Sequence, residues 1–310
     1  MKAERAGLVS IVIVNWNTRN LLLRCIGSIL DGGCSVPCEI IVVDNASADG
    51  SVDAVRSAYP NVTVIANDRN LGFASANNVG FARASGESIL LLNPDTIVSE
   101  KAADKLVAFL EAHSDVGIVG PLIVGQDGCP QISSFGIAPS LREAFLHAIR
   151  IWRIAPKSRL ARQFLMIPRE PEDWIYTRHL LGACMLVRRR VIDQTNGFDE
   201  RFFLFLEETD LCYRTQQMGW RIAYYVGARI THLGEQSMLH ILDRSGGYYI
   251  RSYNYFCRKH GMGRSSVPAT NLCLIMGLIN EAAIALAKHR SITRAANSLR
   301  AIWYGYVAKP

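Results

Sequence analysis

Residues 8–14 read LVSIVIV, a continuous apolar run that is rich in β-branched side chains. Such a run is typical of a strand buried on both faces of a parallel sheet. Similar runs recur further along the chain, and segments with helical spacing separate them. The strand-like runs lie at 39–43, 62–66, 88–92 and 116–119, and the helical segments at 17–30, 51–59, 73–85 and 101–112. This alternation predicts an α/β domain built on a mostly parallel central sheet flanked by helices.

The length and charge of the chain limit the classes of partner that we expect. With 310 residues, the chain can form one large domain or two smaller ones. Its net charge of +7 suits an anionic partner such as a phosphate compound, a nucleic acid or an acidic membrane surface. The sequence has no basic stripe interleaved with aromatic residues, so we expect no nucleic-acid partner.

The apolar segments also bear on location. The run at the N-terminus is too short for a signal peptide, and no uninterrupted apolar run reaches the about 20 residues that span a bilayer. The eight cysteines are scattered, and only Cys34 and Cys38 lie close together, without a second pair or a histidine cluster that would complete a zinc site. We therefore expect a cytoplasmic protein with reduced thiols.

Polar side chains follow four successive predicted strands, at the point where each strand ends. They are Asn15 and Asn17, Asp44 and Asn45, the polar stretch 67–70, and Asn93 with Asp95. Ligands of open α/β sheets bind beyond the carboxyl ends of the strands. Turns alone favour Asn and Asp, so any one of these residues can be structural, but their recurrence predicts a binding site. The glycine-rich motifs of dinucleotide dehydrogenases and P-loop NTPases are absent from the sequence.

A second candidate site lies at 197–214, GFDERFFLFLEETDLCYR, where an apolar run precedes Glu207, Glu208 and Asp210. A carboxylate beside an apolar wall has a raised pKa, which suits a general base. If a helix begins at the acids, Glu207 and Asp210 share one face and Glu208 points elsewhere, so their roles can differ. The alternative is that acids near a helix start only favour the helix dipole.

Two segments combine apolar and basic residues. Within 140–155, apolar residues follow helical spacing beside three arginines, and 272–287 is an apolar stretch flanked by basic residues. Each segment fits an amphipathic helix on an anionic membrane as well as ordinary packing on the core, and their recurrence favours the membrane. The prolines that follow the first segment predict a loop. The sequence does not decide whether 140–170 forms a lid over the site or contacts a membrane.

Seven blocks of the sequence resemble the family 2 glycosyltransferases with the GT-A fold, particularly their rhamnosyltransferase-like branch. The blocks are VSIVIVNWN (9–17), EIIVVDNASADGS (39–51), NLGFASANNVG (70–80), LLLNPDT (90–96), LLGACMLVRRR (180–190), the acidic block at 197–214 and ITHLGEQS (230–237). The resemblance implies a GT-A domain over 1–240, with a nucleotide-sugar-binding half at 8–119 and an acceptor and catalytic half at 120–240. A C-terminal helical extension would occupy 241–310.

The resemblance also implies roles for residues of the donor site. Asp44 would contact the nucleotide base with help from the segment that holds Asn15 and Asn17. The nucleotide and sugar pocket would be lined by Asn45, Asn70, Gly72 and Asn77. Asn93-Pro94-Asp95 stands where the family has an Asp-x-Asp motif, so Asp95 would bind Mn²⁺ or Mg²⁺ directly, and the departure at Asn93 would weaken the metal affinity. His232 matches a histidine that meets the metal or the diphosphate in some relatives.

On the acceptor side, Glu208 falls at the position of the family's general base, although the family usually has Asp there, and Glu207 remains its rival. Asp210 would orient its neighbours or pair with Arg214. Gly182 and Ala183 would form a small-residue wall where the acceptor approaches. The arginines 188–190 would contact phosphate or lie in solvent.

The implied reaction is a single inverting displacement in which a sugar, L-rhamnose from dTDP-L-rhamnose, moves to a polyprenyl-diphosphate-linked glycan. We expect it at the inner face of the cell membrane, in cell-envelope polysaccharide synthesis. Two alternatives stay open: a transferase that uses a UDP-sugar such as UDP-galactofuranose or UDP-N-acetylglucosamine, and a non-catalytic membrane-peripheral scaffold that binds nucleotide sugars. A nucleotidyltransferase is disfavoured, because VNWNTR (14–19) lacks the glycine-rich loop of such enzymes.

Overall fold

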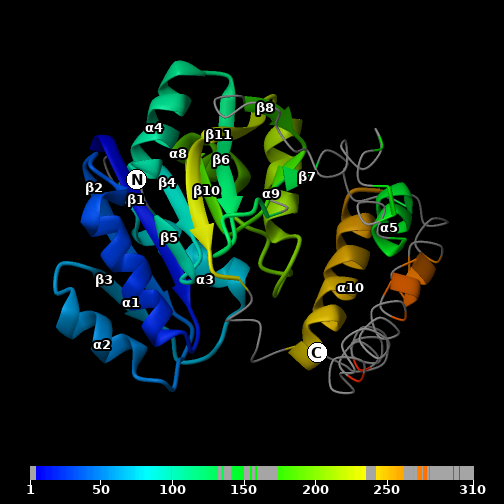
Figure 1. Cartoon of the computed structure of the whole chain (residues 1–310), viewed down its shortest axis with the longest axis horizontal. Coiled ribbons are helices and arrows are strands. Elements are labelled where there is room, and N and C mark those ends of the chain that lie inside the picture. Colours follow the sequence, from blue (N-terminus) through cyan, green and yellow to red (C-terminus); the bar gives the residue numbers. More distant parts are fainter. Residues whose placement is uncertain are drawn as a thin grey trace. The chain divides into compact units, whose positions relative to one another are not determined.

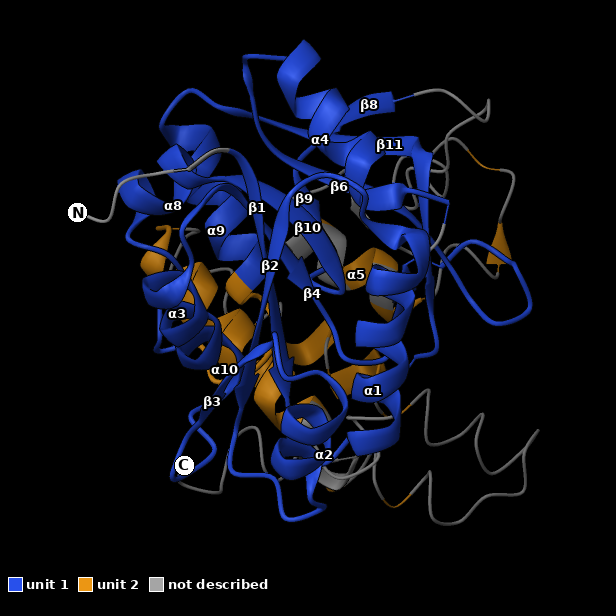
Figure 2. Cartoon of the chain, turned by 90° about the vertical axis from the view of Figure 1, so that its left-hand side faces the viewer, with its two compact units in different colours: residues 1–134, 168–201, 208–237 blue, residues 135–167, 202–207, 238–310 orange. Residues whose placement is uncertain are grey.

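The computed structural model describes residues 5–98, 100–131, 134–135, 141–149, 154–155, 158, 174–234, 242–261 and isolated positions between 268 and 300. The chain forms two compact units, which Figure 2 colours separately. Unit 1 comprises residues 1–134, 168–201 and 208–237, and unit 2 comprises 135–167, 202–207 and 238–310. Each unit therefore draws on segments that are far apart in the sequence. The predicted division at residue 240 stays a prediction.

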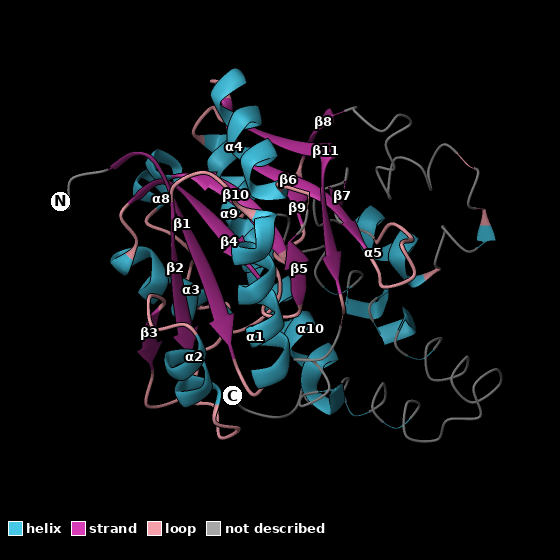
Figure 3. Ribbon diagram, turned by 60° about the vertical axis from the view of Figure 1, so that its left-hand side comes forward, coloured by secondary structure: helices cyan, strands magenta, loops and turns pink. Residues whose placement is uncertain are grey.

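Unit 1 is built on a sheet in the order β3-β2-β1-β4-β10-β6-β11-β5, with β8 paired to β11 in addition. Its strands are drawn in magenta in Figure 3. They are β1 (Arg5–Asn15), β2 (Cys38–Asp44), β3 (Thr63–Ala66), β4 (Gly86–Leu92), β5 (Thr96–Val98), β6 (Val116–Val124), β8 (Trp174–Thr177), β10 (Cys184–Arg188) and β11 (Arg221–His232). The short strands β7 (Ser134–Phe135) and β9 (His179–Leu180) lie outside this sheet.

The sheet has a parallel half and a mixed half. Strands β3, β2, β1 and β4 run parallel, as predicted from the apolar runs. Beyond β4 the direction changes, because β10 is antiparallel to both β4 and β6, and β11 is antiparallel to β5 and β8. The α/β class is thus confirmed, and the sheet as a whole is mixed.

Helices cover both faces of the sheet in unit 1 (Figures 1 and 3). They are α1 (Arg19–Ser28), which continues into the π-helical turn η1 (Ile29–Gly33), α2 (Ser51–Ala58), α3 (Phe73–Arg83), α4 (Ala102–Ala112), α8 (Arg189–Thr195) and α9 (Glu207–Gln217). Residues of α1, α2 and α4 share one buried cluster with Ile11 and Ile13, whereas α3, α8 and α9 share the other with Val12 and Val14. Successive residues of β1 therefore alternate between two cores.

One element is longer than the sequence predicted. We expected a strand over 116–119, but β6 continues to Val124. Pro121 has no N–H to donate, yet it is accommodated where the pairing with β11 shifts register: Tyr225 is opposite Pro121 and Arg229 is opposite Leu122. The three residues of β11 between these partners form a bulge.

Unit 2 contains α5 (Leu141–Ala148) and α10 (Leu242–Lys259). Aromatic residues of 202–206 pack on α10: Phe202 meets Tyr255 edge to face, with ring centroids 4.8 Å apart, and Phe203 stacks on Tyr248 at 5.0 Å. Of the predicted helix over 140–155, the structure describes α5 at Leu141–Ala148, where Leu146 is buried but Phe145 is exposed. Trp152 and most of 272–287 lie outside the described residues. No helix in the described part of the chain is long and apolar enough to cross a membrane.

Candidate active site

The carboxyl ends of β1 and β2 carry a buried polar network. The pairing of the two parallel strands sets Asn15 opposite Asp44. The Asn15 Nδ2 donates to Asp44 Oδ1 at 2.8 Å and to the Ser47 hydroxyl at 3.1 Å. The Ser47 backbone N–H donates to the other Asp44 oxygen at 2.8 Å. Asn15 and Asp44 are almost fully buried, so the loop after β2 is locked to the end of β1.

The same network determines how α1 begins. Neither Asn17 nor Thr18 caps the helix with its side chain. The Thr18 hydroxyl donates to Asn15 Oδ1 at 2.7 Å, and Asn17 Oδ1 accepts from the Ala48 N–H at 2.8 Å. The first N–H of α1, on Arg19, donates instead to Asp49 at 2.8 Å. Asn17 adopts a φ of 53°, so it is a turn residue that ties the β1 loop to the β2 loop.

The ends of β2 and β3 and the start of α3 are also joined. Asn45 donates from Nδ2 to the Gly72 carbonyl at 3.1 Å and accepts from Asn67 at 2.9 Å. Asn70 Oδ1 accepts from the Gly72 N–H at 2.9 Å. Asn45, Asn70 and Gly72 therefore lie together, as expected. Asn77 is buried one turn inside α3 and donates to the Phe73 carbonyl at 2.9 Å, so it belongs to the helix and not to this loop cluster.

Asp95 and His232 meet where β5 pairs with β11. His232 is opposite Thr96 in the register, and the Leu233 N–H donates to the Asp95 carbonyl at 2.8 Å. Asp95 Oδ1 lies 3.2 Å from His232 Nε2, and both side chains are largely buried. A carboxylate oxygen and an imidazole nitrogen that face each other fit a divalent cation such as Mn²⁺. The described residues include no group of three such ligands, so other ligands of a cation would come from substrate or water.

The turn that carries Asp95 is held by its backbone. The Asn93 N–H donates to the Ala183 carbonyl at 2.9 Å, and the Asn93 carbonyl accepts from the Thr96 hydroxyl at 2.7 Å. Cys25 packs against the same turn, and burial raises the pKa of its thiol to about 12. That thiol stays protonated near neutral pH, which disfavours a role as a nucleophile.

The acidic residues at the start of α9 occupy different environments. Glu207 and Asp210 are buried, whereas Glu208 is half-buried. A Cβ built on Gly182 would lie 3.6 Å from both Cβ and Cγ of Glu208, so the backbone at Gly182 faces this side chain. The helix α9 begins at Glu207, as the predicted split between these acids requires, and Glu208 is the most exposed of the three.

Asp210 accepts a hydrogen bond of 2.7 Å from Arg214, four residues further along α9, as predicted. Arg214 also donates to the carbonyls of Thr195 and Gly197, at 2.6 and 2.7 Å. The buried ion pair therefore attaches α9 to the turn that follows α8.

Asn78 of α3 is a structural residue that the sequence reasoning missed. Its side chain accepts from the Phe198 N–H and donates to the Phe198 carbonyl, both at 2.9 Å, and it also donates to Glu200 at 2.9 Å. Asn is a poor helix former, so its presence at position 78 within a predicted helix weakly indicates that the side chain makes a specific contact. The residue clamps the backbone of the loop that leads to the acidic cluster.

Two of the arginines 188–190 bond to backbone carbonyls, and contact of these residues with phosphate stays a prediction. Arg188 donates to the carbonyls of Val116 and His113, at 2.7 and 3.1 Å, and burial lowers its pKa. Arg189 donates to the Gly86 carbonyl at 3.1 Å. Gly86 and Val116 begin β4 and β6, so these contacts lie at the opposite end of the strands from Asn93 and Asp95. Arg190 is exposed and lies over the Trp220 ring.

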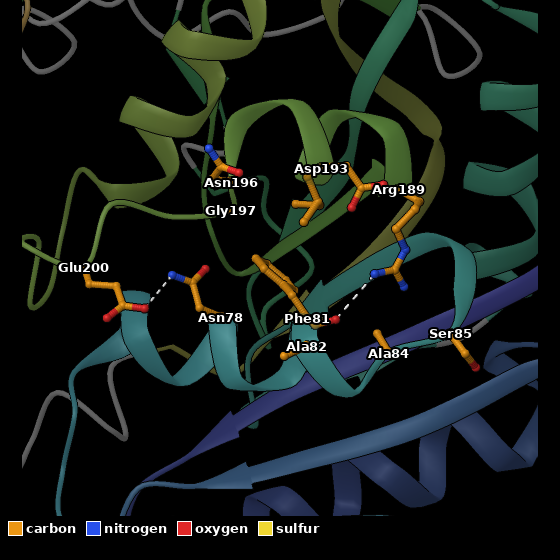
Figure 4. A pocket seen from close by; sticks show the side chains of 11 residues that line it. Asn78, Phe81, Ala82, Ala84, Ser85, Arg189, Asp193, Asn196, Gly197 and Glu200 are labelled. Carbon is orange, nitrogen blue, oxygen red and sulfur yellow. Dashed lines mark hydrogen bonds between the residues drawn. The ribbon is translucent and has the colours of Figure 1, made fainter. Parts of the chain in front are cut away.

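A cavity of about 680 Å³ lies between α3 and α8 (Figure 4). Its polar lining includes Asn78, Arg189, Asp193 and Glu200. Figure 4 shows Asn78 bonded to Glu200, and Arg189 bonded to the carbonyl of Phe81. Arg189 lines this cavity, but none of the residues predicted at the strand ends does.

Comparison with known proteins identifies the class of the chain. The sequence model of glycosyl transferase family 2 matches residues 10–194, which is more than half of the chain. This protein therefore belongs to glycosyl transferase family 2.

Its relatives include rhamnosyltransferases. Over 210 residues, the chain is 32% identical to the N-acetylglucosaminyl-diphospho-decaprenol L-rhamnosyltransferase of Mycobacterium tuberculosis (strain CDC 1551 / Oshkosh). That match covers 63% of this chain and 66% of the relative, which is just under two thirds of the relative's length. The chain is also 25% identical to the rhamnosyltransferase WbbL of Escherichia coli (strain K12) over 202 residues, which cover 61% of this chain and 71% of WbbL.

The fold agrees with that of solved glycosyltransferases. The mannosyltransferase PcManGT from Pyrobaculum calidifontis, solved in complex with GDP-Man and Mn²⁺, matches with a TM-score of 0.58. The match covers 96% of this chain and 86% of that one, at 16% sequence identity. The expected GT-A fold is thereby confirmed.

Proposed function

We propose that this protein is an inverting, metal-dependent glycosyltransferase that moves L-rhamnose from dTDP-L-rhamnose to a hydroxyl of a lipid-linked glycan. The observation that carries the proposal is the Asp95–His232 pair at the strand ends, at 3.2 Å, within a unit that also places Glu208 against Gly182. The two rhamnosyltransferase relatives support the choice of sugar. A polyprenyl-diphosphate-linked acceptor is supported by the name of the mycobacterial relative.

In this proposal the strand-end network binds the donor. Asp44, with Asn15 and Asn17, recognises the nucleotide base, while the loop cluster of Asn45, Asn70 and Gly72 lines the nucleotide and sugar pocket. Asn77 and Asn93 support this pocket from α3 and from the turn before Asp95. Asp95 and His232 hold a divalent cation, Mn²⁺ or Mg²⁺, which neutralises the diphosphate leaving group when it is bound.

Glu208 acts as the general base in the proposed reaction. It takes the proton of the acceptor hydroxyl as that oxygen attacks C1 of the sugar, and the bond from C1 to the diphosphate oxygen breaks. Attack from the opposite face inverts the anomeric centre. Gly182 and Ala183 leave room for the acceptor beside Glu208, because a larger residue at 182 would approach its side chain. Glu207 is the rival base, and Asp210 orients α9 through Arg214.

We further propose that the protein works at the cytoplasmic face of the cell membrane, as a peripheral protein in cell-envelope polysaccharide synthesis. The net charge of +7 suits an anionic membrane surface. An acceptor with a polyprenyl chain would itself lie in that membrane.

Donor binding is the first test, measured by thermal shift with dTDP-rhamnose, UDP-galactofuranose, UDP-N-acetylglucosamine and UDP-glucose, with and without Mn²⁺ or Mg²⁺. A ligand that binds the native state raises the melting temperature according to its affinity. We expect metal-dependent stabilisation by dTDP-rhamnose alone. Preference for a UDP-sugar would discard the rhamnosyl assignment, and stabilisation that persists in excess EDTA would remove the metal role.

A further inference from the structure

The ring of His232 is held by an amide that lies 101 positions away in the sequence. Gln131, in the turn after β6, contacts His232 twice. Its Nε2 donates to the His232 carbonyl at 3.0 Å, and its Oε1 lies 2.9 Å from His232 Nδ1. The Gln131 backbone is fixed as well, because its N–H donates to the Ile123 carbonyl at 2.8 Å.

These two contacts determine which nitrogen of His232 carries the hydrogen. A backbone carbonyl can only accept, so the amide nitrogen of Gln131 must face the His232 carbonyl and the amide oxygen must face Nδ1. An amide oxygen also only accepts, so Nδ1 must be the donor. In a neutral imidazole the other nitrogen, Nε2, then carries the lone pair. Nε2 is the atom that faces Asp95 Oδ1 at 3.2 Å.

Two lone pairs that face each other at this distance repel, unless a positive charge lies between them. With Nδ1–H fixed by Gln131, that positive charge is either a proton on Nε2, which makes an ion pair with Asp95, or a metal cation that both atoms bind. Partners that bond to the far nitrogen of a metal-binding histidine fix its tautomer and its orientation.

We propose that Gln131 is a positioning residue for the metal site: it holds His232 as the Nδ1–H tautomer, so that Nε2 and Asp95 present their lone pairs to one divalent cation. This inference rests on the metal role in the proposed function. Without Gln131, the ring can instead place its hydrogen on Nε2 and donate it to Asp95, which blocks both ligands.

Mn²⁺ affinity is the first readout, measured by electron paramagnetic resonance of free Mn²⁺ with the full chain. We expect Gln131→Leu to weaken Mn²⁺ binding by about 10- to 100-fold, the range for loss of such a partner. Gln131→Glu keeps an acceptor for Nδ1–H and should restore binding to within a few-fold of the original protein. The matched control is Gln126→Leu, an exposed glutamine of the same turn, which should leave binding unchanged.

The tautomer is the second readout, measured by ¹⁵N NMR of metal-free protein at a pH where the imidazoles are neutral, with His232→Ala to assign the signals. We expect hydrogen on Nδ1 in the original protein and a move towards Nε2 in Gln131→Leu. Hydrogen on Nε2 in the original protein would overturn the inference. So would equal Mn²⁺ binding by the original protein and Gln131→Leu, while the proposed function would stand.

If the original protein binds no Mn²⁺ even when dTDP is present to supply diphosphate oxygens, the metal role fails. The NMR result then decides on Gln131 alone, since the tautomer is read without metal. A tautomer that is unchanged in Gln131→Leu counts against the inference in that case too.

Discussion

Glu208 is the residue whose replacement tests the proposed chemistry most directly. We expect Glu208→Gln to lower kcat by about 10²- to 10⁴-fold, the range for loss of a general base. Stabilisation by the donor should be unchanged, because the proposed role of Glu208 is towards the acceptor. Steady-state kinetics of sugar transfer, with the donor thermal shift beside it, measure both quantities.

The control for this experiment is Glu207→Gln, which removes the neighbouring carboxylate from the same helix start. Because Glu207 is buried, this change should act mainly on stability. Full activity of Glu208→Gln together with an inactive, folded Glu207→Gln would move the base to Glu207.

The thiol of Cys38 gives a second prediction that concerns a single residue. A hydrogen bond from Cys34 lowers the pKa of Cys38 to about 7, although partial burial opposes the shift. The reactive thiolate of Cys38 should therefore form at a lower pH than that of an ordinary thiol. Alkylation by iodoacetamide, followed by peptide mass spectrometry across pH, reads the midpoint.

Two comparisons sharpen that measurement. Cys34→Ala removes the hydrogen bond, so the midpoint of Cys38 should move up towards the ordinary thiol value. Cys129 is an internal control with the opposite sign, because the neighbouring Asp127 raises its pKa. A Cys38 midpoint as high as that of Cys129 would contradict the prediction.

Single residues at the strand ends could be predicted because each follows its strand directly. A local pattern, an apolar run that ends in a polar residue, was enough to find Asn15, Asp44, Asn93 and Asp95. Gln131 and Asn78 could not be found in this way. Their contacts join positions 101 and 120 residues apart, and no local pattern encodes such a partner.

Among the elements, α3 and α9 are attached to the same turn after α8. Asn78 of α3 holds Phe198 by two backbone hydrogen bonds, and Arg214 of α9 holds Thr195 and Gly197. Gly197 has a φ of +70°, and a Cβ there would lie 2.5 Å from Asn78 Oδ1, so the turn has no room for a side chain. The turn connects α3 to the helix that carries the acids.

We expect Asn78→Ala to lower the free energy of unfolding by about 2–3 kcal/mol, because it removes three hydrogen bonds of about 1 kcal/mol each. Urea denaturation of the full chain measures this change. The control Asn61→Ala alters an exposed asparagine and should change stability by less than about 0.5 kcal/mol. Equal effects of the two changes would mean that the clamp contributes nothing.

Most elements of the parallel half could be predicted from the sequence. A buried strand shows as a local run of apolar residues, and the helix that follows it shows as apolar residues at helical spacing. Strand β5 has three residues, too few for a pattern to be recognised. The antiparallel placement of β10 between β4 and β6 depends on contacts between distant segments. Whether two strands pair parallel or antiparallel depends on the path of the chain between them. The pattern of apolar residues within a strand gives no information on that path.

For the whole molecule, charge gives a prediction about location. The net charge of +7 should draw the full chain to vesicles that contain anionic lipid. Binding should fall as salt is raised, because salt screens exposed charges. Sedimentation with anionic vesicles and with neutral vesicles as a control measures both effects. Binding to neutral vesicles that resists salt would point to apolar insertion, and no binding to either kind would remove the membrane from the proposed function.

The bulge in β11 has a consequence for how this fold tolerates changes in chain length. Before the bulge, odd-numbered residues such as Ala223 face the core that contains α1, and after it even-numbered residues such as Ala228 and Ile230 do. An odd number of extra residues between Tyr225 and Arg229 produces this change of parity. His232 lies on the face of Ile230 for this reason. An insertion of two residues in the bulge keeps the parity, whereas an insertion or deletion of one would turn the histidine away from Asp95.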